Sequence, residues 1–132
     1  MSLDDYMCEI VEPTFSRFSS NPNSPRYAYL ACLTLAHVVD YAAPCDKKVR
    51  ALKEEWIKLS EPFLIIDEVA QYFKHGTRFW VKKSKRDNPG GLLITHAIGL
   101  ENGGLTAKDL HNLYFQVRDA LDFVRGQTKK LP

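Results

Sequence analysis

The sequence contains none of the residue spacings that identify common metal, phosphate and nucleophile sites. Its three cysteines, Cys8, Cys32 and Cys45, are too widely separated to form the Cys-x-x-Cys pairs of structural zinc sites. It also contains no Gly-x-x-x-x-Gly-Lys phosphate loop, no Gly-x-Ser-x-Gly nucleophile elbow and no His-Glu-x-x-His zinc helix. We therefore expect reduced thiols, no metal site and no bound cofactor.

Long apolar runs and a strong charge of one sign are also missing. No apolar run approaches the roughly eighteen residues that a membrane-spanning helix needs. Eighteen Lys and Arg face sixteen Asp and Glu, and the formal charge of +2 excludes a dedicated polycation. Because Asp4 and Asp5 stand where a signal peptide would carry cations, we expect a cytoplasmic protein that does not bind membranes.

The composition is that of one ordinary folded domain. The chain has 132 residues, 45% of them hydrophobic and 26% charged, which is unlike a disordered chain. Apolar residues recur at helical spacing nearly throughout, except in a Gly- and Pro-marked region at 76–105. We predict one mainly α domain over residues 1–132. It is a bundle of four or five helices, with a short β-hairpin or irregular insertion at 76–105 before the last helix.

Several residues mark the expected ends of these helices. Ser2, Ser24 and Ser60 stand where N-caps are expected, and Asp46 is predicted to cap a further helix. Pro13 lacks an amide donor and clashes with the preceding turn, which predicts a kink or a new helix start at that point.

The helix predicted over about residues 25–43 is apolar on nearly all sides. This pattern favours a central and most buried position. We expect this helix, the helix after Ser60 and the last helix to pack lengthwise against each other. The predicted core comprises Leu30, Leu33, Val38, Phe63, Ile66, Val69, Phe73, Leu113, Val117 and Leu121.

His37 and Asp40 are the polar residues of this apolar helix that most need an explanation. Their spacing of three residues makes them neighbours on one helix face, which we expect to point into the seam between helices. One interpretation is structural, with the buried ring bonding Asp40 or a backbone carbonyl and joining two helices. The other makes His37 a proton carrier or metal ligand that Asp40 orients. The candidate catalytic residues are therefore His37, Asp40 and, from the helix after Ser60, His75.

Lys74 and His75 close the helix that follows Ser60. They either complement the negative end of its dipole or form, with Arg78, an anion-facing corner near His37. The predicted solvated or partner-facing side of the same helix comprises Asp67, Glu68, Gln71 and Lys74.

A basic segment lies inside the predicted insertion, directly after Phe79 and Trp80. This combination can contact a phosphate backbone while stacking a base, although a solvated loop tip is the other interpretation. Its cations are Lys82, Lys83, Lys85 and Arg86.

Two stretches resemble an uncharacterised bacterial family of helical bundles. They are residues 35–41, which contain His-x-x-Asp, and residues 63–75, which end in Lys-His. In that family a short strand region and a closing helix follow, and the likeness spans about residues 26–125 in layout. Its helix arrangement is similar to that of HEPN-type bundles, some of which cut RNA. The HEPN nuclease pattern places an arginine four to six residues before a histidine near a helix end. No Arg–His pair of this chain has that separation.

We favour a non-enzymatic interaction or structural module with a small polar cluster. In this hypothesis His37, Asp40 and His75 join helices or line a small pocket, and the partner is a second copy or another protein. One alternative is an HEPN-like protein that binds or cuts RNA, using the basic segment for backbone contacts. The other is a metal-dependent enzyme.

Overall fold

Helices make up nearly all of the part of the chain that the structure describes. The computed structural model describes residues 1–75 and 107–131, with side chains at 1–71 and 113–131, and these residues contain no strand. The mainly α bundle is therefore confirmed, whereas the predicted insertion at 76–105 lies outside the described residues. The elements in chain order are α1 (Leu3–Tyr6), the π-helical turn η1 (Met7–Val11), α2 (Glu12–Ser20), α3 (Pro25–Ala36), α4 (Val38–Ala42), the 3-10 turn η2 (Asp46–Lys48), α5 (Val49–Leu59), α6 (Glu61–His75) and α9 (Ala107–Lys129).

The three serine N-caps are confirmed. Each hydroxyl accepts a hydrogen bond from the backbone N–H three residues later, at 3.1 Å for Ser2 and Ser60 and at 3.3 Å for Ser24. The predicted cap at Asp46 is wrong, because this residue begins the 3-10 turn η2. Helix α5 follows Lys48 without a side-chain cap.

Pro13 lies in the first turn of α2, so the predicted new helix start at this point is confirmed, and a π-helical turn precedes it. The chain stays helical from Leu3 to Ser20, and the N–H of Glu12 reaches back five residues to the carbonyl of Met7. In an ordinary α-helix the proline ring would collide with the carbonyl four residues back. The wider turn makes room for the ring, so α2 starts here without a break in the helical chain.

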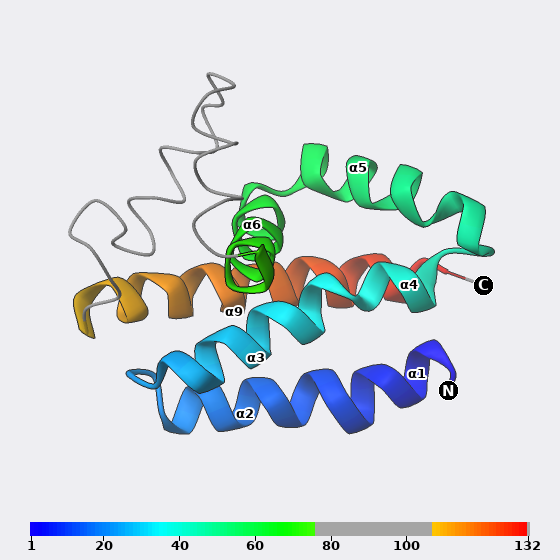
Figure 1. Cartoon of the computed structure of the whole chain (residues 1–132). Coiled ribbons are helices and arrows are strands. Elements are labelled where there is room, and N and C mark those ends of the chain that lie inside the picture. The colour runs from blue at the N-terminus through cyan, green and yellow to red at the C-terminus, as the bar shows by residue number, and fades with distance from the viewer. Residues whose placement is uncertain (76–106, 132) are drawn as a thin grey trace, which may run out of the picture.

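Helix α6 crosses the bundle instead of running along it. Figure 1 shows α6 end-on, with α3 and α9 lying across the view, and α6 contacts both of them. The expected lengthwise packing is therefore wrong. Helix α6 also buries more side chains than α3 does, including Phe63, Ile65 and Ile66, so the prediction that residues 25–43 form the most buried helix is wrong. Helix α3 is nevertheless central, because it contacts α2, α6 and α9.

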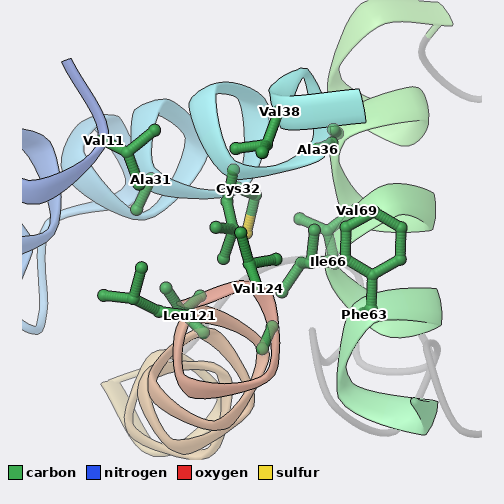
Figure 2. Packing of buried hydrophobic residues seen from close by; sticks show 14 of the residues in the cluster. Val11, Ala31, Cys32, Ala36, Val38, Phe63, Ile66, Val69, Leu121 and Val124 are labelled. Atoms are coloured by element: carbon green, nitrogen blue, oxygen red, sulfur yellow. The ribbon is translucent and has the colours of Figure 1, made fainter. Parts of the chain in front are cut away.

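The core forms where α3, α6 and α9 meet, as Figure 2 shows for a cluster that includes Cys32 and Val124. Leu30 and Leu33, predicted as core residues, are only half-buried, and Phe73 lies outside the described side chains. The predicted core residues that are confirmed as buried are Val38, Phe63, Ile66, Val69, Leu113, Val117 and Leu121.

Aromatic packing holds α5 on the bundle. The Trp56 ring meets Phe63 of α6 and Phe123 of α9 edge to face, with ring centroids 5.5 and 5.9 Å apart. Leu59, the last residue of α5, lies beyond this contact and is 60% exposed. Trp56 is thus the main anchor of a helix whose other face is charged.

An ion pair between Arg125 and Glu12 connects the last helix, α9, to the start of α2. Nε and Nη2 of the Arg125 guanidinium each donate to one oxygen of the Glu12 carboxylate at 2.7 Å. The third nitrogen, Nη1, donates to Asp122 at 3.0 Å. The hydrogen bond to Glu12 raises the pKa of the Arg125 guanidinium. This pair fixes α9 against the start of α2, beside the π-helical turn.

The three cysteines should separate by burial in a thiol-labelling experiment. Burial removes Cys32 from solvent and raises the pKa of its thiol, whereas Cys8 and Cys45 are exposed. We expect two thiols to react with Ellman's reagent in the folded protein, and the third only in denaturant. In the Cys8→Ser/Cys45→Ser variant no thiol should react before unfolding. Three rapidly reacting thiols in the native wild-type protein would contradict the burial of Cys32 in the core.

Candidate functional site

The candidate site lies where the predicted helix at 25–43 breaks into two. His37 separates α3 from α4, with φ −81° and ψ −3°, and its N–H still bonds to the carbonyl of Leu33. The N–H of Asp40 bonds to the carbonyl of His37 in a tighter, three-residue turn. His37, Val38, Val39 and Asp40 are all weak helix formers, so little local preference opposes the break.

His37 and Asp40 interact as their spacing predicted, but they do so in solvent. His37 Nδ1 lies 3.1 Å from Asp40 Oδ2, and the two side chains are 54% and 49% exposed. The prediction that they point into the seam between helices is wrong, because the residues on either side, Ala36 and Val38, take the buried face. The pair spans one turn of a single segment and, among the described side chains, bonds to no other helix.

A stacked pair of tyrosines supports this segment from α1. The rings of Tyr6 and Tyr41 are 4.1 Å apart and inclined by only 15°. The Tyr6 hydroxyl donates to the carbonyl of Thr34 at 2.6 Å, which satisfies an acceptor in the last turn of α3. We call His37, Asp40 and Tyr41 the α3–α4 corner, and Tyr6 ties it to the first helix.

Two hollows flank the corner and share Leu33, His37 and Asp40. The first, which we call the Tyr41 hollow, has a volume of about 370 Å³ and lies toward α1. The second, the Lys53 hollow, has a volume of about 200 Å³ and lies toward α5 and α6. The His37–Asp40 pair thus forms a ridge between them. The Tyr41 hollow is lined by Tyr6, Leu33, Thr34, His37, Asp40 and Tyr41.

The Lys53 hollow contains a charged pair that the sequence did not reveal. Lys53 Nζ lies 2.9 Å from Asp67 Oδ1, and the Asp67 side chain is only 8% exposed. The prediction of a solvated side on α6 is wrong for Asp67 and Glu68, because both are buried under neighbouring elements, while Gln71 is half-buried. Position on α6 alone could not reveal this, since it is α5 that brings Lys53 to Asp67.

The remaining predicted site residues are only partly placed. The backbones of Lys74 and His75 form the last turn of α6, but their side chains lie outside the described residues. Whether His75 approaches His37 therefore stays a prediction. The other predicted binding residues lie wholly outside the described ranges, namely Arg78, Lys82, Lys83, Lys85 and Arg86.

The side chains of the corner offer proton transfer and charge recognition, and none of them is a thiol. Within residues 1–71 and 113–131, no group of three or more His, Cys, Asp and Glu side chains is arranged to hold a metal ion. The buried Cys32 is the only cysteine packed in the core, and its raised pKa disfavours the reactive thiolate. What the corner presents to a ligand is an imidazole, a carboxylate and a phenol ring.

Comparisons of the chain with protein-family models, with curated proteins and with solved structures find no match. The resemblance to HEPN-like bundles therefore stays a prediction. Among the described helices, none combines the length and the apolar character needed to cross a bilayer.

Truncating the two carboxylates of the site should have very different consequences for folding. Asp67→Ala leaves the half-buried Lys53 without its partner, and we expect the free energy of unfolding to fall by about 1–3 kcal/mol. Asp40→Ala removes an exposed contact within one turn and should cost less than about 0.5 kcal/mol. Urea unfolding at pH 7 measures both. An equal loss in the two variants would refute the difference in burial.

Tyr6 should make the fold sensitive to alkali. Burial raises the pKa of its hydroxyl, and the neighbouring Tyr41 and Asp40 raise it further. The unfolded chain loses this proton near pH 10, so above that pH it binds fewer protons than the folded chain. The free energy of unfolding then falls as the pH rises past about 10. Tyr6→Phe should show a shallower fall between pH 9 and 11 in denaturant titrations, and an unchanged slope would contradict this role.

Proposed function

We propose that this chain is a non-enzymatic interaction module that binds a partner protein through the α3–α4 corner. The observation that carries the proposal is the exposed His37–Asp40 pair, which stands as a ridge between two hollows. These side chains are positioned by the fold, yet their polar groups face solvent. Positioned polar and aromatic groups beside hollows are typical of binding surfaces.

The contacts of the corner support binding over a purely structural role. A polar pair that joined two helices would be buried between them, whereas the side chains of His37 and Asp40 are about half exposed and, among the described residues, bond to each other across one turn. The core of the bundle is complete without them, since Val38 and Val39 supply the buried contacts of this segment. The corner is therefore available to a second molecule at little cost to the fold.

The same residues give less support to catalysis. His37 with Asp40 resembles the base and orienting group of an enzyme that uses a nucleophile, but the nearby Thr34 hydroxyl already donates a hydrogen bond to its own helix. Thr34 Oγ1 donates within its own helix, 2.9 Å from the carbonyl of Leu30. Within the described residues no second carboxylate or cation completes a substrate-positioning set around His37 in the Tyr41 hollow.

The RNA-directed alternative depends on residues that the structure does not describe. Its phosphate contacts are assigned to Lys82, Lys83, Lys85 and Arg86, and its chemistry to His37 or His75. It remains a prediction of the sequence, and so does the HEPN-like helix arrangement. The experiment below separates it from the proposal.

Affinity capture from cells of the source organism tests the proposed surface. We compare the wild-type chain with His37→Ala/Asp40→Ala and with a matched control, Arg50→Ala/Glu54→Ala, which removes another exposed pair from α5. A protein partner should bind the wild type and the control, with at least about tenfold less on the corner variant. Because both pairs are exposed, all three proteins should fold equally well.

Two results would overturn the proposal. One is a partner that the corner variant still retains at the wild-type level. The other is captured RNA that ribonuclease removes, or RNA cleavage by the purified chain that His37→Ala abolishes, either of which would favour the alternative function.

A further inference from the structure

The Tyr41 hollow contains an aromatic surface that is held rigid from behind. Tyr6 covers one face of the Tyr41 ring at 4.1 Å, and its own hydroxyl is bonded to the Thr34 carbonyl. The Tyr41 side chain can therefore turn away only by breaking this stack, while 39% of the residue remains exposed. A flat ring fixed in this way is suited to stacking against a flat ligand group.

The charge of the hollow is negative. Asp40 is the only carboxylate among its lining residues, and none of them is Lys or Arg. Asp40 Oδ2 faces His37, whereas Oδ1 has no hydrogen-bond partner among the described residues. A ligand that enters the hollow meets a carboxylate oxygen beside the Tyr41 ring.

The surrounding sequence extends this negative character. Residues 1–16 and 27–46, which supply the lining, contain six Asp and Glu and no Lys or Arg. All eighteen Lys and Arg of the chain lie outside these two segments, together with the other ten acidic residues. The chain as a whole is weakly basic, but the two segments that supply the lining are acidic, with Glu12, one of their six carboxylates, paired with Arg125.

We propose that the Tyr41 hollow binds an arginine side chain of the partner protein. The guanidinium is planar and cationic, so it can stack on Tyr41 while donating to Asp40. An anion would be repelled by Asp40, and an apolar group would leave this carboxylate desolvated without a partner. A volume of about 370 Å³ accommodates the guanidinium and its aliphatic stem. Two arginines of the described residues already lie over aromatic rings, with the Arg118 guanidinium 4.8 Å from the centre of the Phe115 ring and that of Arg26 5.8 Å from the centre of the Tyr27 ring.

This inference rests on the proposed function, because it specifies the chemistry that the corner recognises. Arginine is favoured over lysine because an ammonium group pairs with Asp40 as a point charge but cannot stack as a plane. It is favoured over a free small cation because His37 also lines the hollow, so that the rest of a peptide can lie against it.

Titration with short peptides tests the assignment on the intact chain. The probe is acetyl-Gly-Arg-Gly-amide, with the citrulline peptide as its neutral isostere, and binding is followed by amide chemical shifts in ¹⁵N-labelled protein. We expect saturable shifts centred on Tyr6, Thr34 and residues 37–41 with the arginine peptide, and none of comparable size with citrulline. The lysine peptide should bind more weakly than the arginine peptide.

Variants connect the response to the two proposed contacts. Asp40→Asn keeps the shape of the side chain and should weaken binding by about tenfold, as expected for loss of one charge-assisted hydrogen bond. Tyr41→Leu should weaken it in the same direction by removing the stacking surface. The matched control is Glu54→Gln on α5, an exposed carboxylate removed in the same way, which should leave binding unchanged.

Several outcomes would overturn the inference. Equal binding of the citrulline peptide, or full affinity in Asp40→Asn, would each contradict an arginine side chain held by Asp40. Self-association of the chain that Asp40→Asn abolishes would identify a second copy as the occupant instead. If the cellular partner is lost from the corner variant but no arginine peptide binds, only this inference fails. If the peptide binds but capture is unchanged, the proposed function fails.

Discussion

The burial of α6 across α3 and α9 is the constraint on which the rest of the structure depends. Phe63, Ile66 and Val69 are removed from solvent in this crossing, and burying each such side chain contributes about 1.5–3 kcal/mol. The crossing determines which side of α3 faces inward. Cys32 lies in the cluster that forms between α3, α6 and α9 (Figure 2), whereas Leu30 and Leu33 on another side of α3 are only half-buried.

The α3–α4 corner is a consequence of that orientation. His37 and Asp40 lie on the outward stripe of the segment, where the helix breaks and where α1 packs against α4. Tyr6 stabilises the break by donating to Thr34 and by stacking on Tyr41. A site of exposed polar groups is thus held in place by contacts that begin in the core, which is how a small bundle can present a defined surface.

The same crossing explains why two carboxylates are buried on α6. Asp67 and Glu68 occupy positions that look solvent-facing when α6 is drawn as a surface helix, but α5 and the other elements cover them. The cost of burying Asp67 is offset by Lys53, which reaches it from α5 at 2.9 Å. Helix α5 therefore contributes both the Trp56 anchor and the cation that makes this burial tolerable.

Local rules account for what could be predicted. Serine caps act on the turn that follows them, and apolar spacing marks the faces of α6 and α9, so these features and most of the core were foreseen. The sequence also contains a pattern consistent with the exposure of His37, because Leu30, Leu33, His37 and Asp40 recur at three- and four-residue steps on one helix face. In the structure all four are half-buried or exposed. That outward stripe was missed because the helix is apolar on its other sides as well.

The amino-acid sequence by itself determined that the chain is helical, where several helices begin, and that His37 and Asp40 are neighbours. These properties depend on contacts within a few residues. Only the tertiary structure decided that this pair faces solvent, that Tyr6 supports Tyr41, and that Lys53 meets Asp67. The reason is that burial and pairing between distant segments depend on how helices cross, and an amphipathic pattern specifies a face without specifying what covers it.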